Sequence, residues 1–170
     1  MMKLKFVFLV LFTFHLVSVL AQKTLPIVNL KTLMGENFST SEIKNEGKPM
    51  LICFWRTNHK LSVNELNAIS KEYPFWQKET GVVMYAISVD DNGSSDKVKP
   101  LLETSEWDFQ VLLDENSEFL KALSGFYIPE ILLFNGNGEI VWRKVGFMKG
   151  DEKIIYQMLL KVAKGEEIKE

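Results

Sequence analysis

Three side chains capable of acid–base or nucleophilic chemistry, His59, Ser62 and Glu65, fall within seven consecutive residues. An imidazole, a hydroxyl and a carboxylate are the parts of a serine hydrolase, but three positions on one helix do not fix the geometry of nucleophile, base and orienting acid. No Gly-x-Ser-x-Gly turn surrounds Ser62. We therefore interpret the stretch as a helix end in which Asn58, Lys60 and Ser62 are capping and surface residues. We predict a neutral imidazole at His59, because a helix start disfavours positive charge.

Cys53 is the only cysteine of the chain, so no internal disulfide can form. It lies in the apolar run 51–54, which predicts a buried and inert thiol. The alternative is a reactive lone thiol or an intermolecular disulfide, which would require exposure and a lowered pKa. A metal site is not predicted, because His59 is the only histidine beyond residue 15 and no second imidazole or thiolate accompanies it. No cofactor is expected.

A strand and a helix must position these side chains. Residues 50–55 form an unbroken apolar run, which is typical of a strand buried on both faces. A helical pattern begins near His59, and its apolar residues recur at positions 63, 66, 69 and 73. Pro74 is predicted to end or kink this helix.

The rest of the chain alternates between strand-like and helix-like segments. Strands are predicted at residues 27–33, 82–89, 111–114, 131–134 and 140–145, and helices at 98–102, 116–123 and 154–162. A loop is predicted at 34–37 and a weak helix start at 39–42. The Asn-Gly-Asn-Gly sequence at 135–138 is a strong hairpin signal. This order predicts an α/β sandwich whose sheet is covered on both faces.

Size and charge limit the classes of protein to consider. With 170 residues, of which 46% are hydrophobic, the chain can form one domain with a substantial core. Its formal net charge is −2 and no basic face is indicated, so nucleic acid is not an expected partner.

The first 21 residues differ from the rest. Lys3 and Lys5 precede an apolar stretch over residues 6–20 that ends at Ala21, which is the pattern of a secretory signal peptide. Cleavage after Ala21 would leave a single domain, residues 22–170, in the periplasm or outside the cell with no stable membrane anchor. The alternative is an uncleaved anchor, although about 15 apolar residues fall short of the roughly 20 that span a bilayer.

Several separated segments resemble one family. The stretch 49–55 is similar to the first core strand of thioredoxin-like proteins of the TlpA/redoxin group, and 83–90 is similar to their next strand. Further similarities lie at 112–114, 127–129, 132–134, 138–141 and 145–147. Together they cover residues 25–163. The resemblance implies a thioredoxin-like three-layer α/β/α sandwich with a central mixed sheet.

The resemblance also implies thiol–disulfide chemistry by two cysteines at the start of a helix, and here the sequence departs from the family. Those positions are His59 and Ser62, while Glu65 stands where the group often has an acid. Neither an imidazole nor a hydroxyl exchanges disulfides. We therefore expect no oxidoreductase activity from this motif, and no peroxidase activity, because the peroxiredoxin relatives need a cysteine near the same helix start.

What the resemblance leaves is recognition. In the family a partner peptide lies in a groove beside a cis-proline loop, which corresponds here to Tyr127, Ile128 and Pro129, with Trp55 and Tyr127 as apolar walls. Ile128 would then offer its backbone to an incoming strand, a binding mode that needs no thiol. The alternative is that Pro129 merely starts an edge strand.

Three functional hypotheses follow. The leading one is an exported thioredoxin-fold protein without disulfide exchange that binds an extended polypeptide or joins an envelope assembly. The second is a redoxin-type enzyme that uses Cys53, or a partner's cysteine, in cell redox homeostasis. The third is an accessory domain with a scaffolding role.

Overall fold

The structure is a computed structural model that describes residues 25–91, 93 and 95–168. The predicted signal peptide, residues 1–21, lies outside the described residues. Within the described part of the chain, no helix combines the length and the apolar character needed to cross a membrane.

In the described part of the chain, seven strands form one sheet in the order β2-β1-β5-β4-β3-β6-β7. Strands β3, β4 and β5 are mutually parallel, while β6 runs antiparallel to β3, and β7 runs antiparallel to β6. The strands are β1 (Asn29–Lys31), β2 (Asn37–Ser39), β3 (Met50–Trp55), β4 (Val83–Ser88), β5 (Gln110–Leu113), β6 (Glu130–Phe134) and β7 (Ile140–Val145). The helices are η1 (Thr40–Glu42), α1 (Lys60–Thr80), α2 (Ser95–Glu103), α3 (Glu118–Ala122) and α4 (Asp151–Ala163).

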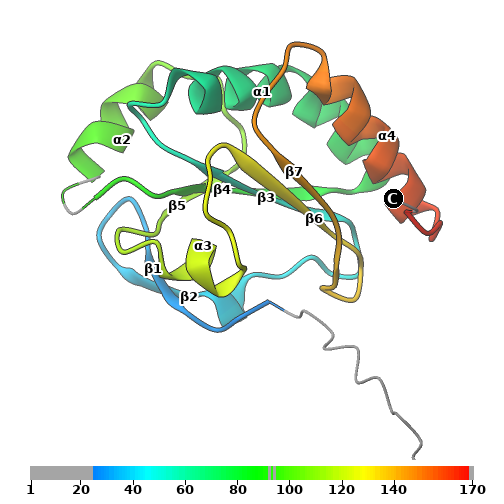
Figure 1. Cartoon of the computed structure of the whole chain (residues 1–170), viewed down its shortest axis with the longest axis horizontal. Coiled ribbons are helices and arrows are strands. Elements are labelled where there is room, and N and C mark those ends of the chain that lie inside the picture. The colour runs from blue at the N-terminus through cyan, green and yellow to red at the C-terminus, as the bar shows by residue number, and fades with distance from the viewer. Residues whose placement is uncertain (1–24, 92, 94, 169–170) are drawn as a thin grey trace, which may run out of the picture.

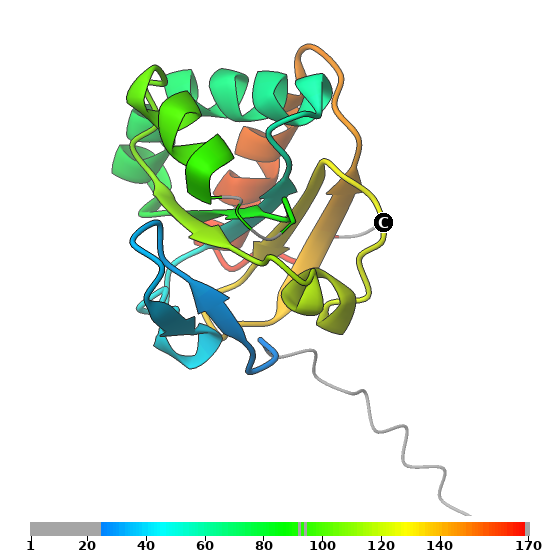
Figure 2. The ribbon, with the colours of Figure 1, turned by 90° about the vertical axis from the view of Figure 1, so that its left-hand side faces the viewer.

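Helices cover both faces of the sheet (Figures 1 and 2). Helices α1, α2 and α4 lie on one face, and the short helix α3 lies on the other with the 3-10 turn η1. Strand β3 shows why: all six of its side chains are buried. The predicted mixed sheet with helices on both faces is confirmed.

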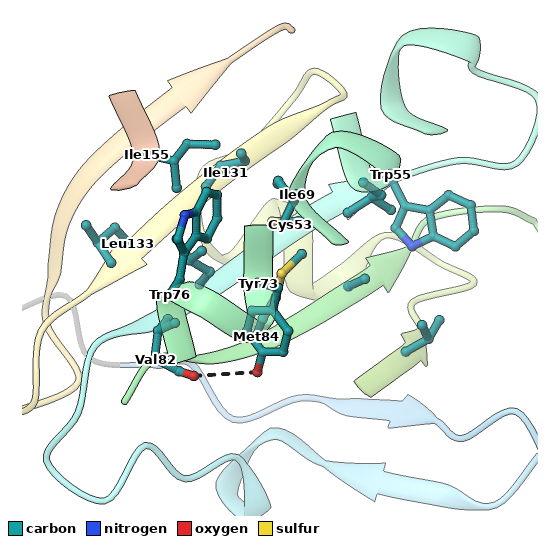
Figure 3. Close-up of a cluster of buried hydrophobic side chains, with 14 of the residues drawn as sticks. Cys53, Trp55, Ile69, Tyr73, Trp76, Val82, Met84, Ile131, Leu133 and Ile155 are labelled. Carbon is teal, nitrogen blue, oxygen red and sulfur yellow. Dashed lines mark hydrogen bonds between the residues drawn. The ribbon is translucent and has the colours of Figure 1, made fainter. Parts of the chain in front are cut away.

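Alternate residues of β3 contribute to two separate cores. Leu51, Cys53 and Trp55 face α1 and α4, where they join the cluster drawn in Figure 3. Ile52 and Phe54 face the opposite way and pack with α3. A single strand therefore ties the two layers together.

One of the two alternatives for Pro74, an end of the helix, and the length of one predicted strand need correction. Pro74 does not end its helix, because α1 continues to Thr80 and buries Tyr73 and Trp76 on either side of the proline. This packing outweighs the roughly 3 kcal/mol that an interior proline costs. The predicted strand 27–33 is shorter in the structure, where β1 covers only Asn29–Lys31 and pairs with β2. The sequence of β2 is too polar and too short to indicate a strand.

The packing of α3 gives a test of this architecture. The Phe119 side chain is fully buried and meets the ring of Phe54 edge-on, with 5.5 Å between ring centroids. We expect Phe119→Ala to lower the free energy of unfolding by about 3–5 kcal/mol, measured by urea denaturation, because it leaves a cavity. Phe126, which is 78% exposed, is the control, and Phe126→Ala should change stability by less than about 1 kcal/mol. Equal effects would contradict the packing described.

Candidate functional site

The loop between β3 and α1 is fixed by a buried carboxylate that follows β4. Asp90 accepts hydrogen bonds from the Thr57 backbone N–H at 2.9 Å, the Thr57 hydroxyl at 2.8 Å and the Ser88 hydroxyl at 2.8 Å. Arg56 donates from Nε and Nη2 to the carbonyl oxygen of Val89. These bonds join the carboxyl ends of two parallel strands and fix the loop that directly precedes α1.

His59 is the N-cap of α1. Its Nδ1 accepts the Ser62 backbone N–H at 3.3 Å and lies 2.7 Å from the Ser62 hydroxyl oxygen. An Nδ1 that accepts this N–H carries no proton, as in a neutral imidazole protonated at Nε2. The assignment of capping to Asn58, and of Ser62 to the surface, is wrong: His59 is the cap, and Ser62 is fully buried because it lies on the inward face of the helix.

Glu65 lies one turn further along the same buried face of α1. Its side chain is 1% exposed, and its Oε1 has no hydrogen-bond partner among the described residues. Burial raises the pKa of this carboxyl to about 8, while the charge of Lys144 lowers it and that of Asp151 raises it. Lys144 forms an ion pair with Asp151 at 2.5 Å, across the end of β7 and the start of α4. Glu65 is therefore a neutral acid over much of the physiological pH range.

Cys53 is remote from any solvent. It is 1% exposed in the middle of β3, and its neighbours come from α1 and the adjacent strands (Figure 3). Burial raises the pKa of the Cys53 thiol well above its usual range, and the charge of Glu65 raises it further. A thiolate, the reactive species, is thus strongly disfavoured at this position.

The loop before β6 reaches the same end of the sheet, because Phe54 pairs with Glu130. The peptide bond between Ile128 and Pro129 is cis. The Pro129 carbonyl oxygen accepts a hydrogen bond from the Gly146 N–H at 2.8 Å. Within the described residues, the backbone N–H and carbonyl of Ile128 make no hydrogen bond to the rest of the chain.

The side chain of Arg143 fixes the position of this loop. Arg143 of β7 pairs with the buried carboxylate of Glu130 and donates to the carbonyl oxygens of Leu123 and Ser124. The end of α3, the loop and β7 are thereby fixed relative to one another.

The two candidate groove walls differ. Tyr127 is 71% exposed, as a groove wall requires, and its neighbour Phe126 is 78% exposed. Trp55 is not a wall of an open groove, because its side chain is fully buried on the α1 face of β3, where Trp107 packs edge-on against it at 5.1 Å. Among the described residues, no cluster of His, Cys, Asp and Glu has an arrangement that could hold a metal ion.

The sequence model of the AhpC/TSA family matches residues 21–143. The chain belongs to the AhpC/TSA family. It is 30% identical over 146 residues to "Thiol:disulfide interchange protein DsbE" from Haemophilus influenzae, which covers 84% of this chain and 74% of that protein. It is 27% identical over 123 residues to "Thiol-disulfide oxidoreductase ResA" from Geobacillus kaustophilus, which covers 72% of this chain and 68% of that protein.

A solved structure supports the same relationship. An uncharacterized thioredoxin-like protein from Porphyromonas gingivalis shares 38% identity and superimposes with a TM-score of 0.73, over 85% of this chain and 94% of that one. The thioredoxin-like, redoxin-type relationship predicted from the sequence is confirmed.

Several residues that shape the site in this AhpC/TSA protein escaped the sequence reasoning. Lys144 and Asp151 approach Glu65 only through tertiary packing, and no local sequence pattern indicates that they lie near it. Arg56 could have been noticed, because it follows the Phe54-Trp55 pair in the loop before α1. Phe126 directly precedes the singled-out Tyr127 and shares its exposure.

The buried acid of this AhpC/TSA protein predicts a pH-dependent stability. Glu65 takes up a proton in the folded state at a pH where the unfolded chain has lost it. The stabilisation from this group is therefore complete below about pH 4.5 and is lost as the pH rises through about 8. Between these values the slope approaches about 1.4 kcal/mol per pH unit. We expect Glu65→Gln, which cannot ionise, to flatten this decline and to be the more stable protein at pH 8, as measured by denaturant unfolding across pH 5–8.

Glu72 provides the matched control, because it is exposed on the same helix. Glu72→Gln should leave the pH profile as it is in the parent protein. If the parent and Glu65→Gln had parallel profiles from pH 5 to 8, the carboxyl of Glu65 would not titrate in this range.

Proposed function

We propose that this protein is exported and binds an extended polypeptide segment beside Ile128, without exchanging disulfides. The observation that carries the proposal is the unpaired backbone of Ile128 at the edge where His59 and Ser62 replace a thiol pair. An unpaired N–H and carbonyl on an ordered loop can accept a strand from a partner chain.

The surroundings of Ile128 support a polypeptide as the ligand. Phe126, Tyr127 and Met148 are 78%, 71% and 74% exposed. The bond between Gly146 and Pro129 places the segment that carries Met148 beside the loop that carries the two aromatic rings. Large exposed apolar side chains near one another are typical of surfaces that contact another protein.

The absence of disulfide exchange is supported by what stands at the helix start. His59 Nδ1 and the Ser62 backbone and hydroxyl bond to each other, so the cap satisfies one N–H of the first helical turn, that of Ser62. Neither group forms a mixed disulfide, and Cys53 is held inside the core.

The proposed location rests on the sequence of residues 1–21, with its basic start and apolar stretch. Secretion or transfer to the periplasm would place the loop that carries Ile128 among envelope or extracellular polypeptides.

The alternative is a redoxin-type enzyme that acts through Cys53 or through a cysteine of its partner. The names of the two relatives, a thiol-disulfide oxidoreductase and a thiol:disulfide interchange protein, favour it. The depth and the raised pKa of the Cys53 thiol oppose a direct role for this residue.

Restoring the thiols separates these functions. We expect the protein, assayed without residues 1–21, to reduce insulin disulfides no faster than dithiothreitol alone. The double variant His59→Cys/Ser62→Cys should accelerate the reaction, because the first thiol would lie at a helix N-terminus that stabilises a thiolate.

Two controls make this assay decisive. Cys53→Ser should leave both results unchanged. The thiol of the native protein should react with a disulfide reagent far more slowly than in denaturant. Insulin reduction by the parent protein that disappears in Cys53→Ser would establish the enzyme and overturn the proposal.

Strand pairing at Ile128 can be tested with a peptide. The probe is the tightest-binding heptapeptide selected from a displayed random library, with an amidated C-terminus. N-methylation at the one residue whose N–H meets the Ile128 carbonyl should lower affinity about tenfold, as measured by fluorescence anisotropy, because it removes a backbone hydrogen bond and adds a clash.

The adjacent peptide residues are the matched control, since their N–H groups point to the opposite edge of the strand. N-methylation there should change affinity little. A peptide whose affinity is insensitive to N-methylation at every position does not bind as an added strand.

A further inference from the structure

A cavity of about 270 Å³ opens next to the loop that carries Ile128, on the face of the sheet that carries α3. It lies where the parallel strands β3 and β4 end, a common place for ligand sites in α/β folds. Its principal lining residues are Arg56, Val89, Leu120, Lys121, Phe126 and Ile128.

Both charged side chains that line the cavity are cations. Arg56 and Lys121 contribute to the wall, no carboxylate does, and neither cation forms an ion pair among the described residues. The wall of the cavity therefore carries two positive charges in a protein whose net charge is −2.

The guanidinium of Arg56 keeps hydrogen-bond donors that suit a carboxylate. Nε and Nη2 donate to the Val89 carbonyl at 3.2 and 2.9 Å, which fixes the plane of the group. The edge formed by Nη1 and Nη2 still has N–H groups to offer, and this edge can bind both oxygens of a carboxylate. The ammonium group of Lys121 donates one hydrogen bond to the Asn116 carbonyl oxygen, at 3.0 Å, and keeps two N–H donors.

Apart from Ser117, the other side chains that line the cavity are apolar, and one of them, Ile128, belongs to the loop before β6. Val89, Leu120 and Phe126 suit a hydrocarbon stem, and Ile128 lines the cavity while its backbone has no hydrogen-bond partner among the described residues. The volume is below the roughly 300–1,000 Å³ of sites that enclose drug-sized ligands, so it fits one side chain. Alternate residues of an added strand point to opposite faces, so one of them can enter.

We infer that this cavity is a specificity pocket for an acidic side chain, best a glutamate, of the polypeptide that pairs with Ile128. The inference rests on the proposed function and adds the chemistry of its ligand. The glutamate stem packs against the apolar walls, and its carboxylate binds Arg56 with support from Lys121.

The heptapeptide probe described above tests the inference when each acidic residue is changed to its amide. We expect one Glu→Gln change in the peptide to lower affinity at least tenfold for the parent protein at low salt. With Arg56→Met, the acidic and amide peptides should bind within threefold of each other. Since Arg56 also holds Val89, Lys121→Met provides a second variant, and it should reduce the acid preference without disturbing the fold.

Lys71→Met is the matched control, because Lys71 is exposed on α1, on the other face of the sheet. It should preserve the tenfold preference. A selected peptide that binds the parent equally well as acid and amide, or a preference that survives in Arg56→Met, overturns the pocket while strand pairing at Ile128 stands. If no library peptide binds, or binding ignores N-methylation, the proposed function itself is overturned.

Discussion

Strand β3 is constrained on every side, and the candidate site depends on this constraint. It pairs with β4 along one edge and β6 along the other, and its alternate side chains fill two cores. Its carboxyl end is therefore held firmly, and three segments meet there: the loop that starts α1, the end of β4 with Asp90, and the loop that carries Ile128. Small movements of β3 would displace all three together.

The buried polar groups near this end have different energetic roles. Asp90 receives three hydrogen bonds, so its burial is well compensated and it stabilises the loop. Glu65 lacks comparable partners and tolerates burial by remaining protonated. Evolution of a protein rarely retains an unsatisfied buried acid for stability alone, since an apolar residue of similar volume would serve the core at least as well. In this chain it lies on the buried face of a helix whose first turn carries His59 and Ser62.

The sequence was most informative where one local pattern dominates. The apolar runs that became β3, β4 and β6 predicted strands closely, because a parallel or central strand must be apolar on both faces. The Asn-Gly-Asn-Gly sequence likewise predicted the hairpin turn between β6 and β7. The sequence was silent or misleading where tertiary packing decides: the helix through Pro74, the burial of Ser62, and the approach of Lys144 to Glu65. The cavity at Arg56 joins residues more than 60 positions apart, so no local pattern indicates it.

The single thiol has a consequence for how the protein behaves in oxidising surroundings. A chain with one cysteine has no internal disulfides to form or scramble, so its refolding is free of the pairing errors that delay many exported proteins. Because Cys53 lies in the central strand, its sulfur meets solvent only when the sheet itself opens. Disulfide-linked dimers would therefore accumulate only from molecules that have unfolded. The rate at which these dimers appear would measure the rate at which the core opens.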